Sequence, residues 1–247
     1  MSRVAAAVRT HDRDRFQTVL FAPQSARESL FALYAFNYEI ARVRETVREE
    51  MLGRIRLQWW REAVDSAFAG QPARRHDVVE ALGAAIRRHR LTRAYFERLI
   101  EARESDLGGD APATLAALEA YCEASSASLV YLAAEILGGA EERAAREVGI
   151  GYGIAGLLRA MPYHSAAGRR TVPDIGEAAA AAERHLAAAR TYRVPRAALA
   201  AFLPAIVASR YLVRLKGAGG DPFDPALSAP DPLQSWRLLA ASLRGRF

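Results

Sequence analysis

Cysteine is nearly absent from the 247-residue chain: Cys122 is the only one, which excludes an intrachain disulfide and a zinc site with several cysteine ligands. No apolar run approaches the ~20 residues of a membrane-spanning helix. The longest, 199–208, is interrupted by Pro204. The five histidines include no pair four residues apart, so a zinc site on one helix is not expected. These absences favour a protein of a reducing compartment without a membrane span.

Lysine is equally scarce, and with Lys216 as the only one, arginine carries nearly all of the positive charge. The 34 basic residues exceed the 28 acidic ones, which gives a formal net charge of +6. Arginine suits bidentate contacts with phosphate and carboxylate groups. The excess is compatible with an anionic lipid, a diphosphate or an acidic partner, and does not select among them. The glycines within 149–153 match no nucleotide-binding loop, and we expect no nucleic-acid partner.

Hydrophobic residues make up 51% of the chain and recur with helical spacing in every long segment, whereas the alternation typical of strands is absent. We therefore predict an all-α protein with a leader segment, 1–14, and one domain, 15–247. The expected helices cover about residues 29–48, 52–69, 76–90, 92–106, 114–137, 141–161, 176–192, 196–215 and 233–243.

Two stretches of small residues predict closely packed helices. The serine-rich run 125–128 lies inside an expected helix and lacks the glycines of a nucleophile elbow, so we interpret it as a packing face. The glycines within 149–153 favour the same kind of close approach. In the helix expected at 52–69, we expect Ile55, Trp59 and Val64 to share one side.

Acidic residues cluster near the end of the first expected helix. Glu45 and Glu49 are four residues apart and would share a helix face, with Arg42 and Arg44 interleaved. A magnesium site is one interpretation of converging carboxylates, but a mixture of both charges is more typical of a solvated, salt-bridged surface.

A second polar cluster is basic. Arg159 falls near the end of an expected helix, and the loop 168–170, Gly-Arg-Arg, follows. Arginines beside a helix end could hold a phosphate group, or could cap a surface turn. The spacing leaves both interpretations open.

Together these segments resemble the squalene/phytoene synthase family, in the right order from about residue 15 to the C-terminus. The resemblance implies a single-domain, isoprenoid-synthase-like helical bundle around a central cavity. The segments that carry it are Leu33-Tyr34-Ala35-Phe36-Asn37, Leu57-Gln58-Trp59-Trp60-Arg61-Glu62, Tyr121-Cys122, Leu158-Arg159, Gly168-Arg169 and Pro173.

The resemblance implies two aspartate-rich motifs that hold Mg²⁺ on prenyl diphosphates in active members. Here both motifs are degenerate. The positions of the first read Ala41, Arg42 and Glu45, and those of the second read Gly156, Ala160 and His164. A Mg²⁺ ion needs near-octahedral oxygen coordination, which these residues do not supply. We therefore expect no catalytic residue, no metal and no cofactor.

A narrower resemblance is to the branch of this family formed by the mitochondrial complex I assembly factor. It rests on Leu20–Val64, on Ser125–Gly138, especially on Leu158–His164 with its Arg-x-x-Pro-Tyr-His stretch, and on Gln234–Arg237. It implies a non-catalytic protein that assists complex I assembly, with a complex I subunit or assembly intermediate as partner. The expected location is cytoplasmic, peripheral to the inner membrane surface, or the mitochondrial matrix in a eukaryote. One departure is that the stretch 173–188 looks about one helix shorter than in either group.

Two alternatives remain open at this point. The chain could be a Mg²⁺-dependent head-to-head prenyltransferase, of the squalene or phytoene synthase type, that acts on farnesyl or geranylgeranyl diphosphate. It could also hold an isoprenoid lipid in the cavity without reacting it. In either case the resemblance places the ligand-binding candidates at the former diphosphate end of the cavity: Tyr34, Asn37, Arg159, Tyr163, His164 and Arg169.

Overall fold

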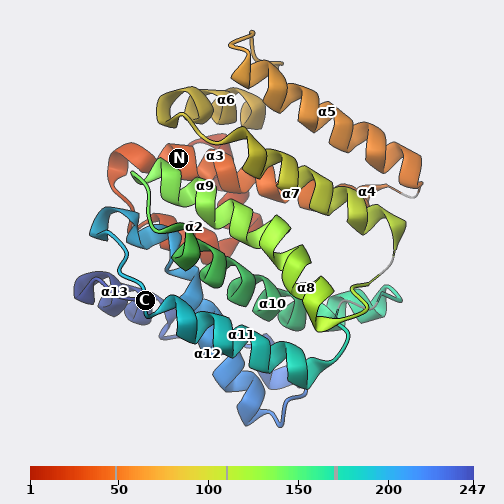
Figure 1. Ribbon diagram of the computed structural model, residues 1–247, viewed down its shortest axis with the longest axis vertical. Helices are drawn as coiled ribbons and strands as arrows, with labels where there is room; N and C mark the ends of the chain where they lie inside the picture. The colour runs from red at the N-terminus through yellow and green to blue at the C-terminus, as the bar shows by residue number, and fades with distance from the viewer. Residues whose placement is uncertain (48, 110, 170–171) are drawn as a thin grey trace.

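The computed structural model describes residues 1–47, 49–109, 111–169 and 172–247, and within these ranges it contains helices and no strand (Figure 1). The predicted all-α fold is therefore confirmed. The first half comprises α1 (Arg3–His11), α2 (Arg13–Val19), α3 (Gln24–Ala41), α4 (Val43–Thr46), α5 (Glu50–Phe68), α6 (Asp77–His89), α7 (Arg93–Ser105) and the 3-10 turn η1 (Asp106–Gly108).

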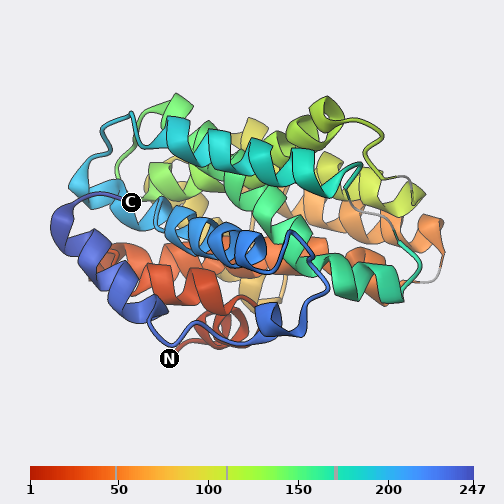
Figure 2. The same cartoon turned by 90° about the horizontal axis from the view of Figure 1, so that it is seen from below.

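The second half comprises α8 (Leu115–Cys122), the π-helical turn η2 (Glu123–Ala127), α9 (Ser128–Ile136), α10 (Glu142–Ala166), α11 (Ile175–Ala189), η3 (Arg196–Ala201), α12 (Pro204–Gly217), η4 (Pro225–Ser228) and α13 (Gln234–Arg244). The 25-residue α10 runs between α8–α9 and α11–α12 and packs against all of them (Figures 1 and 2). Its buried residues lie between Ala144 and Leu158, so this part of α10 runs through the interior of the bundle.

The first residues of the chain belong to the packed bundle. Ser2 caps α1 by accepting a hydrogen bond from the backbone of Ala5, and Val4 and Val8 are buried against α3. Asp12 ends α1 and caps α2. The segment 1–14, predicted as a leader, thus brings its polar end to the wall of a cavity described below.

The small residues predicted to allow close packing do so between α10 and η2. A Cβ atom on Gly149 would lie 2.2 Å from the Cα atom of Ala127. One on Gly153 would lie 3.0 Å from the Cβ atom of Ser126, and Ser128 is completely buried. A π-helical turn occurs at this crossing, inside what is otherwise the single helix predicted at 114–137.

The helix predicted at 29–48 was wrong in its second half. α3 ends at Ala41, the short α4 ends at Thr46, and Val47 has an extended backbone. Glu49 also has an extended backbone, so Glu45 and Glu49 do not share a helix face. On α5, the predicted common side of Ile55, Trp59 and Val64 is wrong as well. Ile55 is 58% exposed whereas Val64 is 3% exposed, because nine residues of helix place the two about half a turn apart.

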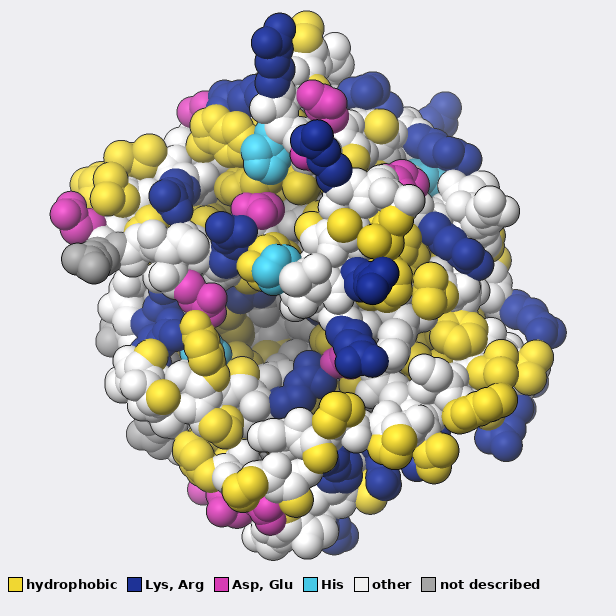
Figure 3. All heavy atoms as spheres, turned by 180° about the vertical axis from the view of Figure 1, so that it is seen from behind, with side chains coloured by type: hydrophobic (Ala, Val, Ile, Leu, Met, Phe, Trp, Pro, Cys, Tyr) yellow, Lys and Arg dark blue, Asp and Glu magenta, His cyan; other side chains and the backbone are white. Residues whose placement is uncertain are grey.

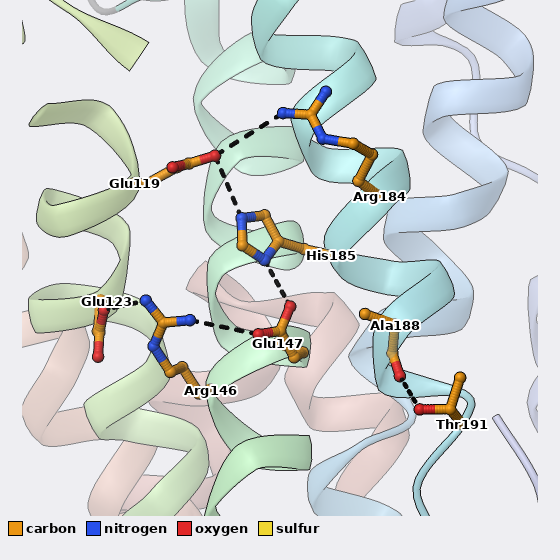
Figure 4. A network of polar contacts seen from close by, with 8 residues as sticks. All are labelled: Glu119, Glu123, Arg146, Glu147, Arg184, His185, Ala188 and Thr191. Atoms are coloured by element: carbon orange, nitrogen blue, oxygen red, sulfur yellow. Dashed lines mark hydrogen bonds and ion pairs between the residues drawn. The ribbon is translucent and has the colours of Figure 1, made fainter. Parts of the chain in front are cut away.

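A polar network ties α8, η2, α10 and α11 together (Figure 4). His185 lies between two carboxylates, with Nδ1 2.6 Å from Glu147 and Nε2 3.3 Å from Glu119. Arg146 donates to Glu123 at 2.7 Å and pairs with Glu147 at 3.3 Å. These contacts fix α11 on α10 and so hold one wall of the bundle in place.

Candidate functional site

Two adjoining cavities lie in the interior of the bundle. The first, of about 460 Å³, is walled by the α1–α2 junction, α3, η2 and α10. The second, of about 520 Å³, lies between the C-terminal ends of α3 and α10 and the start of α8. Arg103, Tyr121 and Leu157 form their common wall. Figure 3 shows a face with a hollow near its middle and charged side chains along the rim.

The second cavity brings two residues of the first degenerate motif near one residue of the second. Ala41 and Glu45 reach it from α3 and α4, and His164 reaches it from α10. Arg42 instead turns back along its own helix, with Nη1 3.4 Å from Glu39. Positions that are far apart in sequence therefore face each other across one space, as the family resemblance implies.

Arg15 is buried beside the first cavity. Its Nη1 donates to Asp12 at 2.7 Å, and its guanidinium carbon lies 4.8 Å from the ring centroid of Tyr152 and 5.5 Å from that of Tyr34. Burial disfavours the charged form, but Asp12 and the two rings outweigh it and raise the pKa of Arg15. Burial also raises the pKa of Tyr152 to about 12. The cavity wall therefore carries a fixed cation and a neutral phenol.

A second ion pair closes the other side of the first cavity. Arg159 Nη1 donates to Asp14 at 2.6 Å, and Gln234 Nε2 donates to the other oxygen of the same carboxylate at 3.0 Å. Burial alone would raise the pKa of Asp14, but Arg159 and the Gln234 hydrogen bond outweigh it and lower that pKa. Three segments, α2, α10 and α13, are thereby joined through one carboxylate.

Arg103 stands in the wall between the cavities. Its Nη1 donates to the Tyr121 hydroxyl at 2.7 Å and to Asp106 at 3.2 Å, and the Tyr121 hydroxyl donates in turn to Asp106 at 3.1 Å. Burial opposes its charge, but Tyr121 and Asp106 outweigh this effect and raise the pKa of Arg103. Asp106 is consequently occupied by two donors.

Three buried polar atoms around the first cavity have no hydrogen-bond partner among the described residues: Asn37 Oδ1, Ser126 Oγ and Arg103 Nε. Asn37 is only 8% exposed and Ser126 only 7%. A buried polar atom without a partner costs roughly 1–3 kcal/mol. This cluster offers one acceptor, one hydroxyl and one donor to a polar molecule in the cavity.

The rim of the second cavity is basic. Arg169 and His164 both line it, and the Arg169 guanidinium carbon lies 5.8 Å from the ring centroid of Tyr163. Burial and the neighbouring Arg169 lower the pKa of His164. Arg170, the last residue of the predicted phosphate-binding loop, lies outside the described residues. The helix that carries Arg159 was predicted to end near Met161, but α10 continues through Pro162 to Ala166.

The donors present do not fit the Mg²⁺ sites that the fold family implies. The second cavity presents two carboxylates, Glu45 and Asp106, against three guanidinium groups, those of Arg44, Arg103 and Arg169. Asp106 already accepts two hydrogen bonds. Among the described residues, no group of three or more His, Cys, Asp or Glu side chains is placed to hold a metal. Octahedral coordination by carboxylate oxygens has no counterpart here.

The predicted candidates fall into three groups. Asn37 and Arg159 line the first cavity, whereas His164 and Arg169 line the second. Tyr34 lies in the core beneath Arg15 and is 3% exposed, and Tyr163 is 57% exposed. Of the degenerate second motif, Gly156 lines the first cavity and Ala160 is partly buried on α10.

Sequence reasoning missed the two buried cations, Arg15 and Arg103. A signal was available for both. Arg15 lies three and four residues before Thr18 and Val19, and Arg103 follows Leu99 and Ile100 at the same spacing, so each arginine shares a buried helix face.

Comparison with known proteins agrees with this geometry. The squalene/phytoene synthase family model matches residues 8–174. The chain belongs to the squalene/phytoene synthase family. It is 32% identical over 270 residues to the bovine (Bos taurus) NADH dehydrogenase (ubiquinone) complex I, assembly factor 6, with 97% of this chain and 81% of the relative covered. The human (Homo sapiens) protein of the same name is 30% identical over 93% of this chain and 80% of its own length.

Solved structures of the family share the fold. A dehydrosqualene synthase in complex with a ligand superposes with a TM-score of 0.81 over 98% of this chain and 94% of its own, at 14% identity. The squalene synthase HpnC from Alicyclobacillus acidocaldarius gives a TM-score of 0.79 over 89% and 94%, at 21% identity. The isoprenoid-synthase-like bundle predicted from the sequence is thereby confirmed.

Proposed function

We propose that this chain is a non-catalytic member of the squalene/phytoene synthase family that assists the assembly of respiratory complex I. The observation that carries the proposal is the charge of the second cavity. Prenyl transfer would need carboxylates here to hold Mg²⁺. The cavity instead has three arginines, Arg44, Arg103 and Arg169, beside Glu45. Its second carboxylate, Asp106, already accepts two hydrogen bonds. Without a metal, the charge on a departing diphosphate has no electrophilic partner.

The relatives support the assembly role. The bovine and human proteins named complex I assembly factor 6 match nearly the whole chain. Complex I subunits or an assembly intermediate are the partners that we propose, and the proposed location is peripheral to the membrane in which complex I is assembled. Within the described residues, every helix is too short or too polar to cross a bilayer.

The decisive experiment is deletion of the gene in its native host, followed by complementation. We expect the deletion to lower the amount of complex I on native gels and its NADH oxidation rate. The wild-type gene should restore both, and so should Glu45→Ala, because no metal is held there. A deletion strain with normal complex I would contradict the proposed role.

The alternative, a prenyltransferase, is tested on the purified protein. Farnesyl and geranylgeranyl diphosphate are supplied with and without Mg²⁺, and pyrophosphate release is measured beside an active dehydrosqualene synthase. We expect no Mg²⁺-dependent release. Release that is lost in Glu45→Ala would replace the non-catalytic proposal with the enzymatic one.

The unpartnered atoms of the first cavity favour an additional binding function. We propose that the cavities hold an isoprenoid lipid with a polar head, which would meet Asn37, Ser126 and Arg103. Native mass spectrometry of the purified protein should detect the lipid. Gly156→Leu should exclude it, since Gly156 lines the cavity and a Cβ atom there meets nothing within 4 Å. Gly156→Ala is the matched control that should retain the lipid, and ligand-free wild-type protein would refute the proposal.

A further inference from the structure

Helix α13 has two apolar faces, and only one of them is used in packing. Leu238 and Ala241 are buried and pack against η3 and α12. Three other apolar side chains of the same helix are exposed: Trp236 by 66%, Leu239 by 38% and Leu243 by 66%. We call Trp236, Leu239 and Leu243 the α13 stripe.

The stripe is a continuous surface and not the margin of the core. At about 100° per residue, its three members fall within roughly 60° of the helix circumference, nearly opposite Leu238 and Ala241. Leu233, just before α13, adds a further apolar side chain that is 51% exposed. A Trp and two Leu side chains held in water on one helix face indicate an interaction surface.

The charged residues within and after α13 are all basic. From Leu233 to Phe247 the chain contains three arginines, Arg237, Arg244 and Arg246, and no acidic residue. Arg237 pairs with Asp231 at 3.2 Å, whereas no ion pair is found for Arg244 or Arg246 within the described ranges, and both are exposed. Figure 3 shows yellow apolar side chains beside dark blue ones at the edge of the molecule that carries α13 in Figure 1.

Another exposed apolar cluster, on α5, lies beside an ion pair of its own helix. Met51, Leu52 and Ile55 on α5 are 64%, 48% and 58% exposed. They share their helix with the Glu50–Arg54 ion pair, at 2.6 Å, so acidic and basic groups both lie beside them. Arg244 and Arg246, exposed and without an ion pair within the described ranges, distinguish α13 and point to an anionic surface rather than to a partner of mixed charge.

We propose that the α13 stripe docks on an anionic lipid bilayer, with the three apolar side chains at the level of the acyl-chain boundary and Arg244 and Arg246 among the headgroups. An amphipathic helix with Trp and Leu on one side and arginines beside them has the composition of an interfacial membrane anchor. The proposal deepens the peripheral location given under the proposed function. It is tested with lipid alone, so its failure is distinct from failure of the complex I role.

The test uses the purified full chain and sedimentation with vesicles. Vesicles of phosphatidylcholine with about a third phosphatidylglycerol should bind the protein, pure phosphatidylcholine should bind it weakly, and about 0.5 M NaCl should reduce binding. The vesicle affinity of the variant W236S/L239S/L243S should fall by about tenfold or more. The matched control, M51S/L52S/I55S, should bind as the wild type does. All six positions are exposed, so both variants should remain folded, which thermal unfolding verifies.

Tryptophan fluorescence gives an independent measurement. Trp236 should shift its emission to shorter wavelength on vesicle binding, and the shift should be absent in Trp236→Phe. Equal vesicle binding by the two triple variants would overturn the proposal. The proposal would also be overturned if the wild type did not bind vesicles and formed a dimer in sedimentation velocity that the α13 variant dissociates. The stripe would then be an interface between copies of the chain.

Discussion

Two glycines on α10 should respond in opposite ways to the same added methyl group. Gly149 faces the π-helical turn, and a Cβ atom there would lie 2.2 Å from the Cα atom and 2.6 Å from the backbone nitrogen of Ala127. These are backbone atoms that cannot rotate away. Gly156, two turns later on the same helix, lines the first cavity, and a Cβ atom there would meet nothing within 4 Å.

The magnitudes follow from two opposing effects. Replacing glycine by alanine inside a helix gains roughly 0.5–1 kcal/mol of stability. Overpacking costs roughly 1–3 kcal/mol, and contact with rigid backbone belongs at the upper end. We therefore expect Gly149→Ala to lose about 2 kcal/mol and to lower Tm by about 4–8 °C in a chain of this length. Gly156→Ala should gain up to about 1 kcal/mol and raise Tm.

The assay is chemical and thermal unfolding followed by circular dichroism, with both variants measured beside the wild type. The difference between the variants matters more than either value, because helix propensity contributes equally to both. If Gly149→Ala were as stable as Gly156→Ala, the close approach of α10 to the π-helical turn would be wrong. The shape of the first cavity, which depends on that approach, would then be wrong as well.

Two further predictions concern charges. Arg15→Met should lower the free energy of urea unfolding by about 3–5 kcal/mol, because Asp12, whose side chain is 17% exposed, would lose its cation. Arg3→Met removes an exposed ion pair and should cost under about 1 kcal/mol. Equal losses in the two variants would refute the buried pairing. The His164 proton resonances should titrate below pH 6.5, and Arg169→Met should move the midpoint upward. Since the pKa of His164 is lower in the folded state, its contribution to stability is present above about pH 6.5 and lost as pH falls through the folded pKa. An unchanged midpoint in Arg169→Met would contradict the electrostatic coupling.

The helices that the sequence predicts best are those with one buried face and clear ends. The helix predicted at 76–90 is observed as Asp77–His89, since its buried positions follow the helical repeat and Arg90 ends it in a left-handed conformation. The break at Arg42 could not be read locally, because apolar residues with helical spacing continue beyond it. α1 was missed for the opposite reason, since most of its residues are alanines or polar and Val4 and Val8 mark its buried face only faintly.

The residues of the candidate site also fall into those that the sequence identifies and those that it does not. Asn37, Arg159 and Arg169 were identified from family motifs and do line the cavities. Arg15 and Arg103 were not identified: their helical spacing indicates a buried face, but it does not show which partners hold each charge there. The Tyr152 ring that faces Arg15 and the Tyr121 hydroxyl bonded to Arg103 come from other helices, and local sequence does not show that they meet.

The cations in the cavity walls are held by carboxylate and phenol groups of the chain itself. Arg103 is held by Tyr121 and Asp106 within hydrogen-bond distance, and Arg15 is held by Asp12 and by Tyr152, so each cavity wall is stabilised by its own ion pair. Asp12, Asp14 and Asp106 are thereby paired with Arg15, Arg159 and Arg103, whereas no ion pair is found for Glu45 among the described residues. With these three aspartates paired and guanidinium groups lining both cavities, the groups best accommodated there are anionic or hydrogen-bond-accepting. The proposed non-catalytic role rests on this charge distribution: the family fold is retained, but the cavities present cations where the metal-dependent reaction would need carboxylates.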